Sequence, residues 1–543
     1  MNQRTGGPRR NPGIVRAILG LVVLLGALWG YGESERLTLI SVLDGRGVSW
    51  AKPLPQGQDR GEDELSPLSP DECRLYSMVV YQTAVLISSD YYREVSVPQL
   101  LAAALSALAD EVGERVPPAL RNDPEKWFDN TEPVGVIMEF RKQLGNRRAL
   151  RGRDLEISLR GMFKILDPHT GFLTAQDRKR MYQMDTAASG TGLVLAERMG
   201  KGPVVIADVD LGSPAHWAGL VPGDRIWAID GQSIEELPSV EVEARLQALA
   251  AQIGRRIHLS VETAQTATRR QVELTSEIYE VESVLGFRRT DAKQWSYWLD
   301  ESAKIGYVRI LEIYLRTPDK FQSVLRELTN QGLRGLVLDL RDCTGGSLNA
   351  ALRIADLLLA EGPICTVKYR RAVNKGLAQP GGLQETHVSS REDSFTDFPL
   401  MVLIGSETRG GGELIAAALQ DNQRAILVGQ RTHGKATVQQ PIPLTHPVGP
   451  YHEMKLSVGL FQRPSGKNMQ RPWNERESDQ WGVLPDRGFE VRLSPQLEQR
   501  LREGRRQRDL SRPEAAHALD NPKADPVLYW ALRALRKQLE KRS

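Results

Sequence analysis

Cysteine is scarce in this chain of 543 residues, which contains only Cys73, Cys343 and Cys365. An odd and sparse set excludes a framework of disulfides. One bridge is compatible with an oxidising compartment, and the sequence does not decide which pair would form it. A chain of this length is too long for one ordinary hydrophobic core, so two to four domains are expected.

The chain also lacks an excess of positive or negative charge. The 71 Lys and Arg side chains are balanced by 68 Asp and Glu side chains, which leaves a formal net charge of +3. The basic run at residues 500–508 is the main exception, and we interpret it as a solvated helix face. We therefore expect no nucleic-acid partner.

Patterns that bind metals are missing as well. The eight histidines form no HExxH motif and no Cys/His cluster. We therefore expect no metal site and no cofactor.

With 41% hydrophobic and 26% charged residues, the composition is that of a globular protein.

The amino end contains an uncharged run at residues 17–32 that is rich in Leu, Val and Gly. The arginines before it are Arg4, Arg9, Arg10 and Arg16. Positive charge before an apolar stretch orients the amino end toward the cytoplasm. The run is long for the apolar core of a signal peptide and slightly short for a membrane-spanning helix. Trp29 and Tyr31 lie at its far end, and no Ala-x-Ala cleavage site follows. We favour an uncleaved membrane anchor over a cleaved signal, and either one places the rest of the protein outside the cytoplasm, in the cell envelope.

Turn residues and periodicity divide the chain into segments. Prolines and acidic residues mark a linker after the apolar run, and a helical pattern follows it. We expect the anchor or signal at 1–32, the linker at 33–70, a helical domain at 71–186, a β-domain at 187–280, an α/β core at 281–495 and a helical tail at 496–543.

Helices and strands are expected in each segment. Helices of the first domain are predicted at 97–105 and 154–163. The β-domain is predicted to have strands at 193–195, 204–207, 225–231 and 257–261, and helices at 212–220 and 241–251. The core is predicted to alternate strands at 305–310, 335–340 and 400–404 with helices at 319–329, 348–360 and 413–422, before a tail helix at 525–541. Alternation of this kind indicates an α/β core.

The β-domain contains three glycine-rich motifs in sequence. They are Gly-Thr-Gly-Leu (Gly190, Thr191, Gly192 and Leu193), Gly-Ser-Pro-Ala at 212–215 and Ala-Gly-Leu-Val-Pro-Gly-Asp at 218–224. In this order they resemble a bacterial-type PDZ domain. Successive amides at a glycine turn form an anion-binding nest, and an adjoining strand edge accepts an extended peptide. The alternative is that these glycines only make tight turns.

The other segments resemble the carboxyl-terminal processing (tail-specific) proteases, peptidase family S41. The matching motifs are Leu-Asp-Pro-His-Thr-Gly-Phe-Leu at 166–173, Leu-Val-Leu-Asp-Leu-Arg at 336–341 with Gly-Gly at 345–346, Ala-Ala-Leu-Gln-Asp-Asn at 417–422, Gly-Gln-Arg-Thr-His-Gly-Lys at 429–435, Pro-Ser-Gly at 464–466 and Gly-Val-Leu-Pro-Asp at 482–486. The resemblance implies an α+β multidomain fold: a helical amino-terminal domain, a PDZ domain, and an α/β protease core of the ClpP/crotonase type.

The resemblance also implies a serine/lysine dyad, in which a serine attacks the peptide carbonyl and a neutral lysine takes its proton. Lys435 matches the family's lysine, and Gln439 matches its supporting glutamine. Gly345 and Gly411 match the positions whose amides hold the oxyanion.

The sequence departs from the family at the nucleophile. Where the family has Ser-Ala-Ser-Glu, this chain has Gly-Gly-Gly-Glu, so that Gly410 stands at the position of the attacking serine. Gly410 precedes Lys435 by 25 residues, which is the family's interval. Glycine has no hydroxyl, so the dyad is predicted to lack its nucleophile.

Neighbouring residues offer alternatives. Ser406 and Thr408 carry hydroxyls, but their use would require the turn to be rebuilt, and an error of about 1 Å already costs about a hundredfold in rate. Lys435 is either a poised amine or a structural group that pairs with Glu413 or caps a strand. Cys343 is interpreted as a packed, inert thiol rather than a reactive one.

Three functions are compatible with these patterns. We favour an envelope-anchored pseudoprotease that binds protein carboxyl-terminal tails and lacks peptidase activity. The others are a working serine endopeptidase with a rearranged site and a purely structural envelope scaffold. The oligomeric state is open, and a homo-oligomer is one possibility.

Overall fold

The computed structural model describes residues 68–129, 131–173, 188–196, 198, 200–291, 294–370, 383–390, 394–449, 451–472, 480–510 and 521–542. The expected anchor at 1–32 and most of the expected linker lie outside these residues. Within them, no helix combines the length and the apolar character needed to cross a membrane. The chain divides into two compact units, of which the first contains the helices up to residue 171 and the tip of a hairpin at 443–452.

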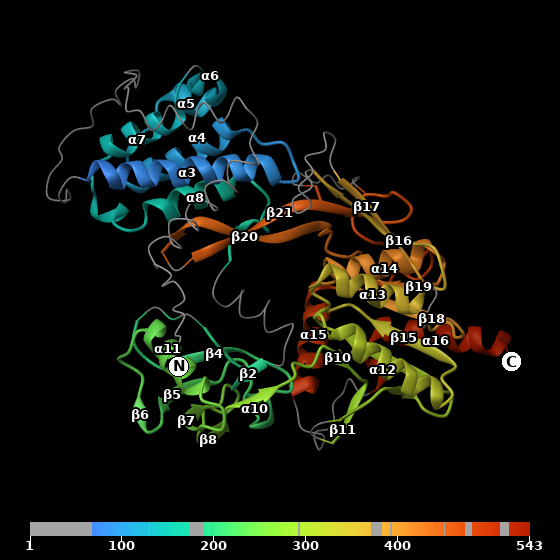
Figure 1. Cartoon of the computed structure of the whole chain (residues 1–543). Coiled ribbons are helices and arrows are strands. Elements are labelled where there is room, and N and C mark those ends of the chain that lie inside the picture. Colours follow the sequence, from blue (N-terminus) through green and yellow to red (C-terminus); the bar gives the residue numbers. More distant parts are fainter. Residues whose placement is uncertain are drawn as a thin grey trace, which may run out of the picture. The chain divides into compact units, whose positions relative to one another are not determined.

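Helices dominate the first unit (Figure 1). Its elements are α3 (Pro70–Asp90), α4 (Val97–Glu111), α5 (Pro118–Asn122), α6 (Pro124–Phe128), α7 (Pro133–Gln143) and α8 (Asp154–Lys164). Helix α4 begins with a capping box in which Ser96 and Gln99 bond each other's backbone N–H. On α8, a Cβ at Gly161 would lie 2.6 Å from the carbonyl oxygen of Ala103, so glycine allows α8 to pack closely on α4. The helices expected at 97–105 and 154–163 are confirmed.

The second unit begins with a small β-domain. Its main sheet has the order β3-β4-β5-β7-β8, with β6 beside β5. The bounds are β3 (Leu193–Leu195), β4 (Val204–Val209), β5 (Arg225–Ile229), β6 (Gln232–Ser233), β7 (Arg256–Glu262) and β8 (Arg269–Thr275). Two helices, α10 (Pro214–Trp217) and α11 (Ser239–Ala250), contribute to the same core cluster as the sheet. Strand β2 (Ala188–Gly190) pairs with β9 (Glu277–Tyr279). The elements predicted for this domain are therefore present.

A mixed sheet forms the centre of the remaining chain. Its parallel strands are β14 (Ile305–Ile310), β15 (Gly335–Asp339), β18 (Leu400–Ile404) and β19 (Ala425–Gly429), with antiparallel β10 (Val284–Leu285) and β13 (Trp298–Asp300) beside β14. Every residue of β14, β15 and β18 is buried. Burial on both faces explains why these strands read as nearly continuous apolar runs in the sequence.

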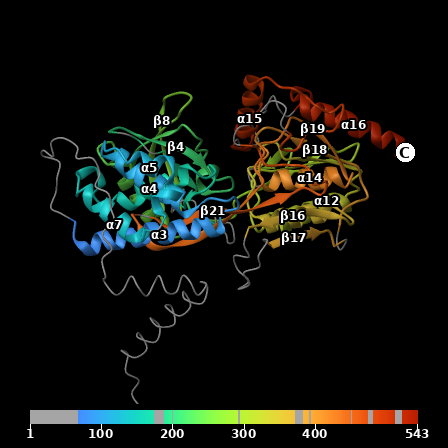
Figure 2. The same ribbon diagram turned by 90° about the horizontal axis from the view of Figure 1, so that it is seen from above.

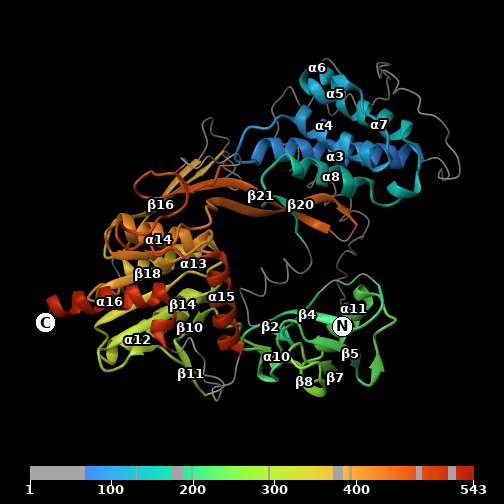
Figure 3. The same ribbon diagram turned by 180° about the vertical axis from the view of Figure 1, so that it is seen from behind.

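Helices cover both faces of this sheet. On one face lie α12 (Thr317–Asn330), α13 (Leu348–Leu358) and α14 (Gly411–Asp421), which share a core cluster with β14, β15 and β18. Helix α16 (Pro526–Arg542) packs on the opposite face, as Figure 2 shows for α14 and α16 on either side of β18 and β19. The expected carboxyl-terminal tail thus contributes a layer of the core, and α15 (Pro495–Leu510) precedes that layer (Figure 3).

The chain also forms a second sheet. Strands β16 (Pro363–Tyr369), β17 (Leu383–Val388), β20 (Thr437–Val448) and β21 (Tyr451–Gln462) belong to it, together with the short β1 (Gly171–Phe172). A short pair, β11 (Arg288–Asp291) and β12 (Gln294–Ser296), lies apart from both sheets. The loop between β19 and β20 carries Lys435, and the turn between β18 and α14 carries Gly410. These connections follow the carboxyl ends of parallel strands, which is where α/β sheets place their ligand sites.

Candidate functional site

The turn at Gly410 joins the end of β18 to α14. Gly410 has φ +52° and ψ −112°, a backbone conformation that residues with a side chain rarely adopt. A strained strand-to-helix turn of this kind is used elsewhere to expose a nucleophile. A Cβ placed on Gly410 would have its nearest heavy atom, the Cα of Gly345, at 3.9 Å. The turn therefore has the shape and the space for a projecting side chain, and none is present.

The two predicted oxyanion positions lie together beside this turn. Gly345 has φ +90°, and a Cβ placed on it would lie 3.1 Å from the backbone nitrogen of Gly411. Gly411 is the first residue of α14, so its N–H has no acceptor within the helix. The backbone N–H of Arg409 donates to the carbonyl of Cys343 at 2.8 Å, which joins the two loops.

A buried carboxyl links the turn to the lysine loop. Glu413 Oε2 accepts hydrogen bonds from the backbone N–H of Gly410 (3.1 Å) and from that of Lys435 (2.8 Å). Its Oε1 accepts from the backbone N–H of Gly434 (2.7 Å) and from the Thr432 hydroxyl (2.5 Å). Because one oxygen atom binds both Gly410 and Lys435, the structure brings the nucleophile position and the lysine loop together.

The environment of Glu413 affects both its charge and the helix. Its side chain is fully buried, and burial raises the pKa of this carboxyl to about 7 even though the hydrogen bonds act in the opposite direction. Its bond to the Gly410 N–H also explains why α14 begins at Gly411, two residues before the predicted start at 413. The polar capping contact extends the helix through the glycines.

Lys435 has the partner that the family resemblance implies. Its Nζ donates to Oε1 of Gln439 at 3.2 Å. The contact between Lys435 and Glu413 that the structure shows runs through the backbone N–H of Lys435. Burial and then the Arg409 guanidinium lower the pKa of nearby His433, while the Glu407 carboxylate acts in the opposite direction.

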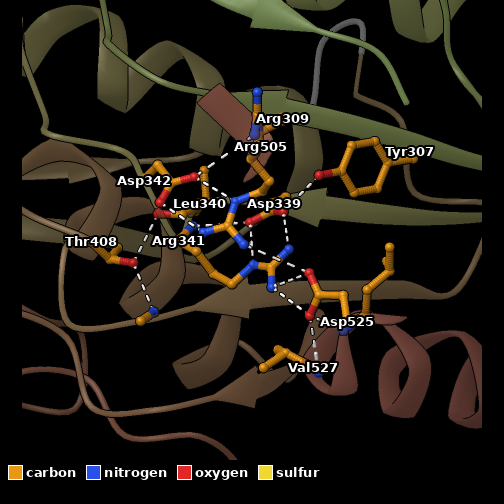
Figure 4. Close-up of polar contacts among 12 residues, drawn as sticks. Tyr307, Arg309, Asp339, Leu340, Arg341, Asp342, Thr408, Arg505, Asp525 and Val527 are labelled. Atoms are coloured by element: carbon orange, nitrogen blue, oxygen red, sulfur yellow. Dashed lines mark hydrogen bonds and ion pairs between the residues drawn. The ribbon is translucent and has the colours of Figure 1, made fainter. Parts of the chain in front are cut away.

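The neighbouring hydroxyls are occupied by structural hydrogen bonds. Ser406 Oγ donates to Oε1 of Glu498 on α15 at 2.6 Å. Thr408 is fully buried. Its Oγ1 donates to the carbonyl of Leu340 at 2.8 Å and accepts from the N–H of Gly405 at 3.0 Å (Figure 4). Both hydroxyls therefore serve to fix the loop that leads to Gly410.

The thiols are buried and unbridged. Cys73, Cys343 and Cys365 are all free cysteines with buried side chains. Burial raises the pKa of Cys343 to about 12, so its thiol is neutral at physiological pH, as its interpretation as a packed residue requires. Within the described ranges, no group of three or more His, Cys, Asp or Glu side chains is arranged to hold a metal ion.

The predicted peptide-binding loop lies in the β-domain between β2 and β3. Gly190 and Gly192 have φ of +119° and +78°, and a Cβ on Gly192 would lie 2.1 Å from the Cβ of Ser213. Thr191 is buried, and its carbonyl accepts from the N–H of Ala215 at 2.9 Å. Leu193 begins β3, which is the terminal strand of its sheet. The loop is thus held close to the start of α10 and opens onto a strand edge.

Sequence reasoning missed the central role of Glu413 and the part played by Thr432. Thr432 Oγ1 donates to Glu413 and accepts from the N–H of Val483 at 2.8 Å. From the sequence, Glu413 is expected only to pair with the Lys435 side chain. A buried acidic residue in the first turn of an otherwise apolar helix was the signal that pointed to a structural carboxyl.

Comparison with known proteins agrees with this geometry. Residues 182–262 match the PDZ domain, and residues 304–487 match peptidase family S41. The carboxyl-terminal-processing protease of Synechocystis sp. is 30% identical over 353 residues, which make up 64% of this chain and 74% of that protein. The carboxy-terminal-processing protease of Bartonella bacilliformis is 27% identical over 397 residues, covering 71% of this chain and 83% of that protein.

Solved structures give a weaker likeness. A photosystem II D1 C-terminal processing protease has 22% identity and a TM-score of 0.40, covering 78% of this chain and 94% of its own. The sequence matches cover both the β-domain and the part of the α/β core that carries Gly345, Gly410 and Lys435. The chain therefore belongs to the carboxyl-terminal processing protease family, peptidase family S41, and contains a PDZ domain.

Proposed function

We propose that this family member has lost peptidase activity and acts by holding protein carboxyl-terminal tails in its PDZ domain. The observation that carries the proposal is Gly410. A dyad peptidase requires a side-chain oxygen at this turn, and glycine supplies only hydrogen. The structural hydrogen bonds of Ser406 and Thr408 support the proposal further, because neither hydroxyl is left to take over the role without breaking the loop.

Tail binding is supported by the loop at Gly190–Leu193. Its glycines allow successive backbone N–H groups to face one anion, here the carboxylate at the end of a peptide. Strand β3 ends its sheet, so its outer edge is available for an added peptide strand. Leu193 and Leu195 pack against the apolar core cluster of the domain, which favours tails with apolar side chains.

The proposed location is the cell envelope, with residues 17–32 as an uncleaved anchor and the described units outside the cytoplasm. The basic residues before this run and the aromatic residues at its end support that orientation. Release of the protein from membranes by alkaline carbonate would contradict the anchor.

Restoration of the missing hydroxyl tests the loss of activity. We expect purified Gly410→Ser protein to cleave casein or a tail peptide that the wild-type protein leaves intact. Only Gly410 should be changed, because side chains at Gly411 and Gly412, which the family's full Ser-Ala-Ser sequence would add, would make close contacts. A Cβ at Gly411 would lie 2.9 Å from Cδ1 of Ile313, and one at Gly412 would lie 3.0 Å from Sγ of Cys343. The positive φ at Gly410 will cost serine about 1–3 kcal/mol of stability.

The matched control is Gly410→Ser combined with Lys435→Ala, which should be inactive because no amine remains to accept the serine proton. A serine-directed fluorophosphonate should label the Gly410→Ser protein and not the wild type. Lysine-dependent cleavage by the wild type, or its labelling within residues 406–413, would show instead that it is a working peptidase with a rearranged site.

Tail binding is tested separately with one fluorescent peptide in two forms, with a free and with an amidated carboxyl end. We expect the free form to bind at least about tenfold more tightly, because an amide lacks the charge that the nest binds. Gly192→Ala should abolish the difference, whereas Gly200→Ala should not. Both glycines have positive φ, but a Cβ at Gly200 meets nothing within 4 Å. Equal affinity for both peptides would favour a structural scaffold.

A further inference from the structure

Helix α16 presents a strongly basic face to solvent. Its apolar face, which includes Leu532 and Leu535, packs on the central sheet. The cations on its exposed face are Arg533, Arg536, Lys537, Lys541 and Arg542, and Glu540 is the one exposed acid along the 17 residues of the helix. Even with Arg536 paired to Asp300 at 2.6 Å, cations outnumber acids on this face.

Two aromatic side chains lie on the same face. Tyr529 is 37% exposed and Trp530 is 46% exposed, and among the residues that the structure describes they are the only exposed Phe, Tyr or Trp side chains. The Arg533 guanidinium lies 5.3 Å from the centre of the Trp530 ring, a distance at which a cation and an aromatic ring attract each other. The exposed aromatic residues of the described ranges are therefore adjacent, and a cation contacts one of them.

The cations and the indole ring follow one side of the helix. Trp530, Arg533, Lys537 and Lys541 are spaced three or four residues apart, so each side chain lies about one turn from the last. At about 1.5 Å per residue, the row extends over about 16 Å. Cations in the last turn of a helix balance its dipole, but that effect fades within one turn and does not account for Arg533 or Lys537.

The basic helix α15 differs from α16 in this respect. The solvated face expected for residues 500–508 is contradicted in part, because Arg505 and Arg508 are buried. Arg505 donates to both oxygens of Asp342, at 2.7 and 2.9 Å. The basic run that stands out in the sequence is thus partly tied to the core, whereas the cations of α16 face solvent.

We propose that the exposed face of α16 binds the surface of a bilayer that contains anionic phospholipids. The cations Arg533, Lys537 and Lys541 contact lipid phosphates, and the rings of Tyr529 and Trp530 lie at the level of the headgroups. Lysine and arginine are attracted to the negative potential of such a surface, and tryptophan and tyrosine favour the boundary between headgroups and acyl chains. This contact goes beyond tail binding, and it does not require that residues 17–32 form an anchor.

An acidic protein surface is the alternative partner for these cations. The aromatic residues favour the bilayer, because their rings bury an apolar body at the boundary while the Tyr529 hydroxyl and the Trp530 indole N–H stay in contact with water. Long cationic side chains likewise keep their charged ends among the headgroups. Contact of Trp530 with lipid therefore distinguishes the two partners.

Fluorescence quenching by brominated lipids measures this contact. The full chain is reconstituted by detergent removal into vesicles of phosphatidylcholine, alone or mixed with phosphatidylglycerol, whose acyl chains carry bromine near the headgroup. The part of the quenching that Trp530→Phe removes belongs to Trp530. We expect this part to be at least about threefold larger in the anionic vesicles, and to fall at about 1 M salt, where charges are screened beyond about 3 Å.

Charge reversal tests the role of the cations. Lys537→Glu removes an attraction and adds a repulsion, so it should lower the quenching of Trp530 in anionic vesicles by about threefold or more, whereas Lys537→Arg should retain it. The matched control is Lys320→Glu, at an exposed position on α12, which packs on the opposite face of the sheet. This control should leave the quenching unchanged.

The outcomes separate this contact from the anchor. Trp29 lies at the far end of the proposed anchor, so the quenching that Trp29→Phe removes reports insertion of the anchor alone. Absence of Trp530 quenching in anionic vesicles would overturn the proposal and favour an acidic protein partner. Equal quenching in the two kinds of vesicle, or an equal loss in Lys320→Glu, would also overturn it, because neither result requires the cations of α16.

Discussion

Four hydrogen bonds converge on the carboxyl of Glu413, three from backbone N–H groups and one from the Thr432 hydroxyl. Their donors belong to two loops that are far apart in the sequence. The same burial that makes these bonds strong disfavours the carboxylate, so the pKa in the folded protein rises from 4.5 to about 7. A raised pKa means that the stability contributed by this group is present below about pH 4.5 and is lost as the pH rises through about 7.

Glu413→Gln is therefore expected to destabilise the protein in a pH-dependent manner. A glutamine has one acceptor oxygen, so its NH₂ group would face either the N–H groups of Gly410 and Lys435 or the N–H of Gly434 and the Thr432 hydroxyl. Each backbone N–H left unsatisfied costs about 1–3 kcal/mol. The cost should be larger at about pH 5.5, where the wild-type carboxyl is protonated, than at about pH 8. Denaturant unfolding at the two pH values measures both effects.

Glu361→Gln provides the control for this substitution, because Glu361 is exposed. It should change the free energy of unfolding by less than about 0.5 kcal/mol at either pH. An equally small effect of Glu413→Gln would show that the carboxyl is not the structural link between the two loops.

Helix α16 illustrates how an element far from the site supports it. Its apolar side chains, among them Leu528, Leu532 and Leu535, pack on the face of the central sheet opposite to α14. A Cβ at Gly335 on β15 would lie 3.1 Å from a methyl group of Leu535, so helix and strand are in direct contact there. At the start of α16, Asp525 binds the Arg341 guanidinium that follows β15. The helix therefore helps to fix the end of β15, which leads into the loop with Gly345.

Truncation of the contact with the sheet should be costly. Leu535 is fully buried, and Leu535→Ala is expected to lower the free energy of unfolding by about 2–5 kcal/mol, through lost apolar contact and the cavity left behind. Lys537→Ala, at an exposed position on the same helix, should have an effect within about 0.5 kcal/mol. Denaturant unfolding distinguishes the two, and equal effects would contradict a structural role for this helix.

Within the second unit, His216 joins the PDZ domain to α15. Its Nδ1 accepts from the N–H of Gly212 at 3.0 Å and its Nε2 faces the carbonyl of Asp509, which together require a neutral ring protonated at Nε2. Burial, and then the neighbouring Arg289 guanidinium, lower the pKa of this imidazole from 6.5 to about 4, and the charge of Arg506 acts in the same direction. A second proton on the ring would face the Gly212 N–H and these two cations.

The whole molecule is therefore expected to lose stability on acidification through this group. Because the folded pKa is depressed, the contribution is present above pH 6.5 and is lost as the pH falls through about 4. A shift of this size corresponds to about 3 kcal/mol. The amide of His216→Gln can accept from the Gly212 N–H and donate to the Asp509 carbonyl, but it does not titrate. This variant should therefore lose this part of the pH dependence of stability. Thermal unfolding between about pH 7 and pH 4 measures the difference, and identical pH profiles would contradict it.

Local sequence patterns predicted most of the elements of this protein. The buried strands at 335–340 and 400–404 and the helix at 97–105 are recognisable because apolar periodicity and caps act within a few residues. The family resemblance also implied that Gly345, Gly410 and Lys435 lie at one site, and in the structure Gly345 lies beside Gly410 while Glu413 binds the backbone N–H groups of Gly410 and Lys435. Helix α14 starts two residues before the predicted position. The hydrogen bond from the Gly410 N–H to the Glu413 carboxylate extends the helix, and three glycines in the sequence give no sign of this contact.

The amino-acid sequence by itself determined which atoms are available: glycine at 410 has no side-chain oxygen. It also determined the order of the domains, since each motif is local. Only the tertiary structure decided that the hydroxyls of Ser406 and Thr408 are held in hydrogen bonds and that Glu413 joins two loops. It also decided that α15 contacts both strand β4 and the loop before Gly410. Such contacts join residues that are remote in the chain, and they depend on which surfaces meet when the sheets and helices pack.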